Sequence, residues 1–235
     1  MMTKTVGMIG GIGPESTVEY YRLLIAAYSE RKGDGSYPRI IINSIDLQKL
    51  VDLVTANELA ELTDYLVAEV LKLAGAGADF AILAANTPHI VFDELRRRAA
   101  LPLFSIVEAT RDAARALRLQ RLGLFGTRFT MRAGFYQELF SGAGIALVTP
   151  DAREQEFIHD KYMNELLKGL FLAETRERLL KIAARLKERE GIEGLILGGT
   201  ELPLILRETE AEELGIPFLD TTRIHVNSII PHLLQ

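Results

Sequence analysis

The chain has 235 residues, of which 48% are hydrophobic, enough to bury the core of one large domain or two smaller ones. A net charge of −5 with both signs interspersed argues against a nucleic-acid partner, and the absence of cysteine excludes disulfides, thiolate metal ligands and a thiol nucleophile. No apolar stretch approaches the roughly 18 to 20 residues of a membrane-spanning helix and no signal peptide is recognisable, so we expect a cytoplasmic protein with no membrane partner.

Short apolar strands alternate with helices along the first half of the chain. The segment Thr5–Ile9 has the pattern of a buried strand, residues 10–14 form a glycine-rich loop, and Glu15–Tyr28 repeats apolar residues at the spacing of a helix. Further strands are expected at Ile40–Asn43, Phe80–Ala84 and Leu103–Val107, and further helices at Asn57–Ala74, at Ile90–Ala99 and from Thr110 onward. This alternation predicts an α/β fold whose parallel sheet is covered by helices on both faces.

The second half of the chain repeats this order at a nearly constant separation. Its segments 121–127, 145–148, 175–188, 195–197 and 216–223 are equivalent to 5–11, 40–43, the helix from 57, 81–83 and 101–111. Such a repeat indicates an internal duplication, with repeats of approximately 1–120 and 121–235, although generic β/α units could also match by coincidence. We therefore predict two pseudo-symmetric, Rossmann-like lobes, each with a parallel sheet.

Polar residues gather where the expected strands end. We name residues 81–89 the first strand-end segment, because their apolar run leads into Asn86-Thr87-Pro88-His89, and residues 195–203 the second strand-end segment, because their run leads into Thr200-Glu201-Leu202-Pro203. Two glycine-containing ends, 10–17 and 126–130, are placed in the same way. In parallel sheets, ligands bind beyond the carboxyl ends of the strands, where backbone N–H groups at helix starts hold anions. If the lobes face one another, these four strand ends line one ligand cleft between them.

Each motif also has a purely structural interpretation. The glycine-rich loop lacks the G-x-G-x-x-G spacing of a nucleotide-binding loop, and Asn86, Thr87, Thr130 and Thr200 could each cap the helix that follows. No other histidine stands at metal-ligand spacing from His89, so no metal site is expected. Capping explains any one of these residues, but it does not explain matched polar residues in both repeats.

Taken together, the motifs resemble the signature segments of the aspartate/glutamate racemase superfamily, nearest its aspartate racemase branch. The segments are Gly10-Gly11-Ile12-Gly13-Pro14-Glu15-Ser16-Thr17, Asn86-Thr87-Pro88-His89, Gly126-Thr127-Arg128-Phe129-Thr130-Met131 and Gly198-Gly199-Thr200-Glu201. The resemblance covers essentially the whole chain and implies a first lobe at 1–102 completed by 215–235, a second lobe at 103–214, and a homodimer. It also implies cofactor-independent racemisation of an acidic amino acid, with neither pyridoxal phosphate nor a metal.

The resemblance carries over a set of substrate-binding residues by motif. Those expected to hold the carboxylate and amino groups of a small amino acid or dicarboxylate are Gly11, Asn86, Thr87, Thr127, Thr130 and Thr200. An acidic side chain would also need a cation, for which the candidates by position are Lys168, Lys49, Arg128 and Lys161, each equally explicable as a solvated surface charge.

The chain departs from the family at the two positions that carry its chemistry. Inverting a stereocentre needs a base on one face of Cα and an acid on the other, and a thiol suits both roles because its pKa of about 8.5 can be tuned towards neutrality. The family's pattern has cysteine directly before Thr200 and usually before Asn86, whereas this chain has Gly199 and Ala85. Neither residue can transfer a proton, so the two-thiol mechanism is excluded.

Four explanations of this departure stay open. The acid and base could have moved to His89, Glu201 or Asp46; the protein could bind a small carboxylate without turnover; it could perform another isomerase or lyase reaction; or the substitutions could be engineered. We favour natural loss in a racemase-like protein that still binds an amino acid or dicarboxylate. On this hypothesis, Ala85→Cys combined with Gly199→Cys should restore racemisation.

Overall fold

The computed structural model describes residues 3–235, and the chain divides into two compact units. Unit 1 comprises Met1–Ile106 with Thr222–Gln235, and unit 2 comprises Val107–Thr221. The divisions expected from the sequence, 102/103 and 214/215, fall slightly earlier in the chain. Each unit contains a wholly parallel four-stranded sheet, and the strand orders β2-β1-β3-β4 and β6-β5-β7-β8 are equivalent. The prediction of an α/β fold with two similar lobes is confirmed.

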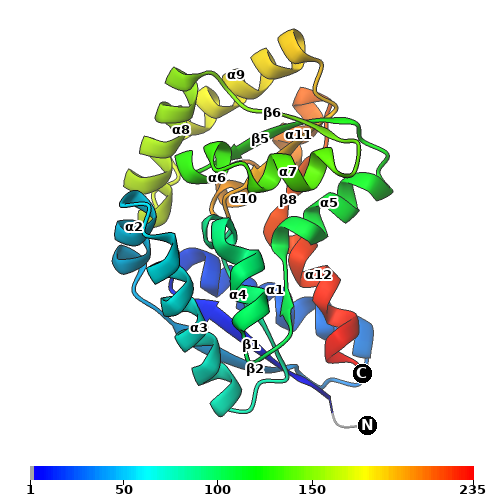
Figure 1. Ribbon diagram of the computed structural model, residues 1–235. Helices are drawn as coiled ribbons and strands as arrows, with labels where there is room; N and C mark the ends of the chain where they lie inside the picture. The colour runs from blue at the N-terminus through cyan, green and yellow to red at the C-terminus, as the bar shows by residue number, and fades with distance from the viewer. Residues whose placement is uncertain (1–2) are drawn as a thin grey trace. The chain divides into compact units, whose positions relative to one another are not determined.

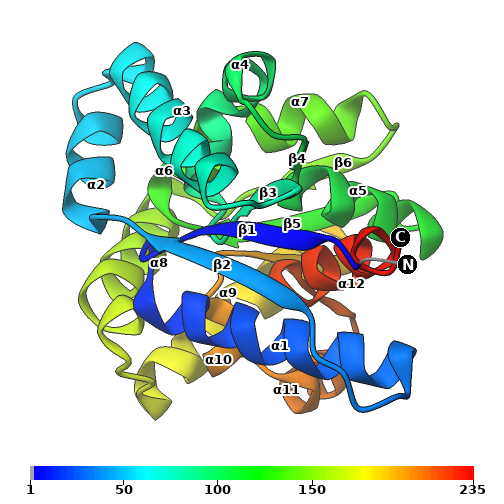
Figure 2. The same cartoon turned by 90° about the horizontal axis from the view of Figure 1, so that it is seen from below.

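Strand β1 (Thr5–Gly10) is central in unit 1, and all six of its residues are buried, as expected for a strand covered on both faces. It pairs with β2 (Arg39–Ser44) and β3 (Phe80–Leu83), and β3 pairs with β4 (Leu103–Phe104). In Figure 2, α1 (Pro14–Lys32) lies on one side of β1 and β2, and α3 (Leu59–Gly75) lies on the other. The other helical elements are α2 (Leu47–Thr55), η1 (Thr87–Val91), α4 (Phe92–Arg98) and α12 (Thr221–Leu233).

Strand β5 (Arg121–Gly126) has the equivalent central place in unit 2. It pairs with β6 (Ala146–Val148) and β7 (Gly194–Gly198), and β7 pairs with β8 (Phe218–Asp220). The helical elements, most of them labelled in Figure 1, are α5 (Ile106–Ala116), α6 (Arg128–Arg132), α7 (Phe135–Ser141), α8 (Ala152–Asn164), η2 (Leu166–Lys168), α9 (Ala173–Glu190), α10 (Leu202–Ile205) and α11 (Glu208–Leu214).

The strand expected at Leu103–Val107 is shorter than predicted. Strand β4 ends at Phe104, and α5 begins at Ile106. Ile106, Thr110 and Ala114 are spaced four residues apart and are wholly buried, which is the burial pattern of one helix face. The apolar run is therefore divided between a short strand and the first turn of a helix, a division that hydrophobicity alone does not reveal.

Helix α8 was not predicted, although its start has a recognisable signal. The Asp151 side chain accepts hydrogen bonds from the backbone N–H groups of Arg153 and Glu154, both at 2.9 Å, and the Glu154 side chain accepts one from the backbone N–H of Asp151 at 3.4 Å. This reciprocal pair is a capping box, which stabilises the first turn. The buried residues of the helix, Ile158 and Tyr162, lie one turn apart, so α8 presents a single narrow face to its unit.

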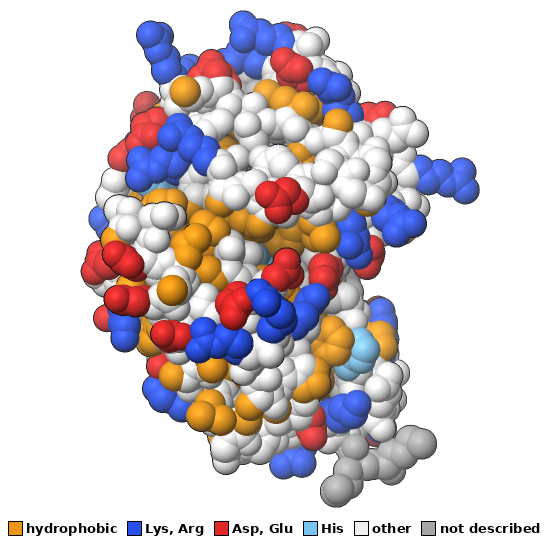
Figure 3. Space-filling model, viewed as in Figure 1, with side chains coloured by type: hydrophobic (Ala, Val, Ile, Leu, Met, Phe, Trp, Pro, Cys, Tyr) orange, Lys and Arg blue, Asp and Glu red, His pale blue; other side chains and the backbone are white. Residues whose placement is uncertain are grey.

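Charged side chains of both signs are interspersed over the face shown in Figure 3, in keeping with the modest net charge. Within residues 3–235, no helix is both long and apolar enough to cross a membrane.

Candidate functional site

The first strand-end segment is buried and leads directly into a 3-10 helix. Ala85 and Asn86 follow β3 with exposures of 7% and 3%, and the His89 backbone N–H donates a 3.0 Å hydrogen bond to the carbonyl oxygen of Asn86. Thr87, the first residue of η1, is partly exposed. The amide and hydroxyl groups expected to bind a ligand therefore stand together at the carboxyl end of β3.

His89 is buried in a neutral form. Its ring stacks on Phe92 with centroids 4.5 Å apart, and neither ring nitrogen has a hydrogen-bond partner among the described residues. Burial, assisted by the neighbouring His225, lowers the pKa of His89 to about 3 from its usual 6.5, while backbone groups of Asn86 and Ala85 oppose this shift. His89 is thus uncharged at neutral pH and is poorly matched to proton transfer near pH 7.

The glycine-rich loop of unit 1 is held by its own contacts. The backbone N–H of Gly11 donates a 2.9 Å hydrogen bond to the Thr17 hydroxyl, and Gly11 has a φ of 79°. A Cβ at this position would lie 2.4 Å from the carbonyl oxygen of Ile45, so only glycine fits. Asp46 is exposed and caps α2 by accepting a 2.9 Å hydrogen bond from the backbone N–H of Gln48. The Gly11 N–H and the Asp46 carboxylate therefore both have structural partners.

The second strand-end segment is built differently, because an aromatic ring occupies the space beside Gly199. A Cβ added to Gly199 would lie 2.4 Å from Cε2, 3.0 Å from Cζ and 3.1 Å from the hydroxyl oxygen of Tyr162. Tyr162 comes from the buried face of α8 and is 5% exposed. A side chain at position 199 and the Tyr162 ring in its present place are therefore sterically incompatible.

The Tyr162 hydroxyl is bound to a buried carboxylate. It donates a short hydrogen bond to Oε2 of Glu201, and the Thr200 hydroxyl donates to the same oxygen at 3.1 Å. Glu201 is wholly buried and Thr200 is 2% exposed. Burial, together with the nearby Glu201 carboxylate, raises the pKa of Tyr162 well above its usual 10, so the phenol keeps its proton at neutral pH.

A second hydroxyl pair stands at the carboxyl end of β5. Thr127 caps α6 by accepting a 3.2 Å hydrogen bond from the backbone N–H of Thr130, and the two hydroxyl oxygens are also 3.2 Å apart. Thr130 Cγ2 would lie 2.9 Å from a Cβ at Gly126, which explains the glycine there. His159 of α8 accepts a 3.3 Å hydrogen bond from the backbone N–H of Arg128, and its burial lowers its pKa from 6.5. His159 is a titratable neighbour of this strand end that the sequence did not single out.

The cations considered for an acidic ligand have ordinary surroundings. Lys168 is exposed on η2, Lys49 lies 4.1 Å from the ring centre of Tyr65, and two others form ion pairs, Arg128 with Glu156 at 3.2 Å and Lys161 with Glu165 at 2.5 Å. Nothing in these contacts distinguishes Lys168 as a ligand-binding residue.

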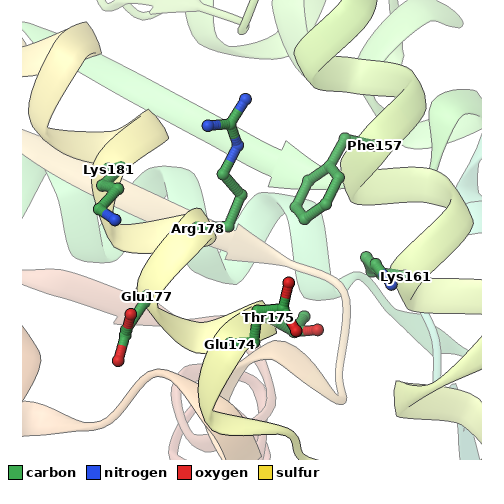
Figure 4. Close-up of a pocket in the computed structure, with 7 residues that line it drawn as sticks. All are labelled: Phe157, Lys161, Glu174, Thr175, Glu177, Arg178 and Lys181. Atoms are coloured by element: carbon green, nitrogen blue, oxygen red, sulfur yellow. The ribbon is translucent and has the colours of Figure 1, made fainter.

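A surface pocket of about 420 Å³ lies between α8 and α9, and of the predicted residues only Lys161 lines it. Figure 4 shows Phe157 of this pocket between Lys161 on its own helix and Arg178 from α9; Arg178 lies 5.8 Å from the ring centre of Phe157. Among residues 3–235, no group of three or more His, Asp or Glu side chains is placed to hold a metal ion.

Tyr162 is the site residue that the sequence interpretation missed. Two signals in the sequence were available. Asp151 and Glu154, at capping-box spacing, indicate the start of a helix, and the glycine at 199 indicates that another group packs closely against the backbone there. Neither signal specifies that the approaching group is a tyrosine of that helix.

Comparison with known proteins agrees with the fold. The chain is 32% identical to an aspartate racemase homologue from Pyrococcus horikoshii OT3, whose structure superposes with a TM-score of 0.83 over 99% of this chain and 100% of that one. A broad specificity amino-acid racemase from Bacillus subtilis is 26% identical over 176 residues, covering 72% of this chain and 70% of that protein. A glutamate racemase from Aquifex aeolicus is 27% identical over 156 residues, covering 65% of this chain and 58% of that protein. The family profile for Asp/Glu/hydantoin racemases matches residues 9–229, and the chain belongs to this family.

Proposed function

We propose that this protein binds an amino acid or a small dicarboxylate through the strand-end residues of its units and does not use two-thiol racemisation. The observation that carries this proposal is that the polar side chains beyond the strand ends are retained, all of them buried except the partly exposed Thr87, whereas the positions before Asn86 and Thr200 hold Ala85 and Gly199. The retained residues are Asn86, Thr87, Thr127, Thr130 and Thr200. The named activities of the relatives, on glutamate and on a broad range of amino acids, support this class of ligand.

The proposal extends to cofactor, assembly and location. We infer a protein that needs no cofactor, forms a homodimer and works in the cytoplasm, with no nucleic-acid partner; family membership and the interspersed surface charges support these points. Sedimentation equilibrium at several protein concentrations tests the dimer, which a single monomeric mass would contradict.

Calorimetry with both enantiomers of aspartate and glutamate, together with succinate and malate, tests ligand binding. A ligand that prefers the folded protein must also raise its melting temperature. Thr200→Val should weaken binding about tenfold, the equivalent of one lost hydrogen bond. Thr175→Val is the matched control, because Thr175 is equally buried in unit 2 but bonds to Glu165.

One calorimetric result would contradict ligand binding. Absence of both heat and thermal shift across all six compounds would remove the proposed function. A loss of affinity in Thr175→Val as large as that in Thr200→Val would remove the assignment of Thr200.

A further inference from the structure

The space beside Gly199 is filled by a group with a polar end. A phenylalanine would fill the ring volume equally well, yet Tyr162 places its hydroxyl against the wholly buried Glu201. Burying a carboxylate is costly, and replacing such hydrogen-bonded groups by apolar ones of the same shape is often neutral or stabilising. Packing alone therefore does not account for a phenol and a carboxylate at this position.

We propose that Tyr162 and Glu201 form the proton-transfer group of the second strand-end segment and exchange the Cα proton of a bound amino acid. The inference rests on the proposed function, because it needs an amino acid bound beside Thr200. The placement supports it: the phenol oxygen lies 3.1 Å from where a Cβ at position 199 would stand, and position 199 is where the family's pattern has its thiol.

The protonation state of the phenol determines how the proton moves. Because burial raises the pKa of Tyr162, a phenolate is not the base, and the acceptor is the Glu201 carboxylate. The Cα–H bond breaks and its proton forms an O–H bond at the Tyr162 oxygen, while the phenol's own O–H bond breaks and that proton passes along the hydrogen bond to Oε2 of Glu201. The electron pair left on Cα spreads into the ligand's carboxylate, where hydroxyl and N–H donors stabilise the charge. The reverse transfer returns a proton that has exchanged with solvent.

The first strand-end segment, as the structure describes it, has no such group. Ala85 has a methyl group at its thiol position, and the pKa of about 3 keeps the His89 ring neutral at neutral pH, so no imidazolium proton is available there. We therefore expect exchange with retained configuration: deuterium enters at Cα of one enantiomer, and the other enantiomer does not accumulate.

Proton NMR in deuterated water measures this exchange on L- and D-aspartate and L- and D-glutamate. The wild-type protein should replace the Cα proton of one enantiomer, and Tyr162→Phe and Glu201→Gln should each slow the exchange roughly 100-fold, the usual contribution of a general acid or base. Tyr136→Phe is the matched control, because Tyr136 is also wholly buried in unit 2, its hydroxyl bonds to Thr110, and burial also raises its pKa. Its exchange rate should equal that of the wild type.

Each result decides between the two proposals. Binding of these amino acids without deuterium incorporation overturns the proton-transfer role and leaves the proposed function standing, as does binding of succinate or malate alone. Absence of binding across all six compounds overturns both. Exchange at the wild-type rate in a folded Tyr162→Phe protein, or accumulation of the opposite enantiomer, overturns the mechanism. If Tyr162→Phe fails to fold, Glu201→Gln provides the same comparison with the ring intact.

Discussion

The two strand-end segments occupy equivalent places in equivalent sheets, yet the residues that precede their polar ends have different surroundings. In unit 1, Ala85 supplies only a methyl group, and His89 is buried with both ring nitrogens unpartnered among the described residues. In unit 2, the Tyr162 ring occupies the space beside Gly199, and the Tyr162 hydroxyl donates a hydrogen bond to the buried Glu201.

This contrast shows that the two equivalent positions differ in what surrounds them. Ala85 is a buried residue with a methyl side chain, whereas Gly199 lies against the Tyr162 ring of α8. The expected consequence is an asymmetric protein in which unit 1 is sensitive to protonation of buried imidazole groups and unit 2 is sensitive to steric crowding.

Acidification should produce the largest effect, in unit 1. Burial lowers the pKa of His89 to about 3 and that of His225 to about 4; His225 contacts the Tyr20 hydroxyl at 2.8 Å and the Phe104 carbonyl at 3.1 Å. Because the unfolded chain binds these protons near pH 6.5, the stability from the neutral rings is fully present above that pH and is lost as pH falls towards 4. At about 1.4 kcal/mol per pKa unit, the loss is roughly 3 kcal/mol for His225 alone.

Urea unfolding between pH 7 and pH 4.5 measures the loss, and amide hydrogen exchange locates it. Protection should fall in β3 and α12 before it falls in β7. His225→Gln should flatten the pH dependence, whereas His232→Gln, a change at a half-buried histidine of the same helix, should not. An identical pH dependence in all three proteins would show that the buried rings are not the cause.

Gly199→Ala should produce the next largest effect, in unit 2. The new Cβ would meet the buried Tyr162 ring at 2.4 Å, and crowding of this kind costs about 2 kcal/mol of unfolding free energy. Gly142→Ala is the control, since a Cβ there meets its nearest atoms at 3.5 and 3.7 Å. In a Tyr162→Ala background the cost of Gly199→Ala should largely vanish, and purely additive free energies would disprove the pairing.

The contact between Gly199 and Tyr162 changes the expected result of the double cysteine variant suggested by the sequence. We expect that Ala85→Cys with Gly199→Cys alone will not restore racemisation, because a Cβ at position 199 would lie 2.4 Å from the Tyr162 ring. A restored two-thiol site needs Tyr162 replaced by a small residue in the same protein.

The smallest effect is expected at Asp46. Since its carboxylate caps α2, Asp46→Ala should cost about 1 kcal/mol of stability and leave ligand affinity and Cα exchange unchanged. Asp151→Ala, at the start of α8, provides a matched cap in the other unit. Loss of Cα exchange in a stably folded Asp46→Ala protein would return Asp46 to the list of acid and base candidates.

The sequence was sufficient for the fold because the fold depends on patterns that are local in the chain. Buried strands such as Thr5–Gly10 and Gly194–Gly198 are apolar runs followed by glycine or polar residues, and their repetition predicted two similar sheets. The motifs beyond these strands also identified the family. The strand at Leu103–Val107 was too long, because an apolar run does not reveal where a strand gives way to a helix. Helix α8 was missed because its two buried residues, Ile158 and Tyr162, give only a weak periodic pattern.

The chemistry of the second strand-end segment depends on residues far apart in the chain. That the thiols are absent follows from Ala85 and Gly199 in the sequence alone, since no cysteine exists to replace them. That the Tyr162 ring lies beside Gly199, and that its hydroxyl contacts Glu201, 39 positions later in the chain, follows from the packing of α8 on its sheet. The sequence alone determines which side chains are present and how they are spaced along the chain. Which side chains become neighbours, and which protonation state each adopts, depends on the surfaces that are buried together in the tertiary structure.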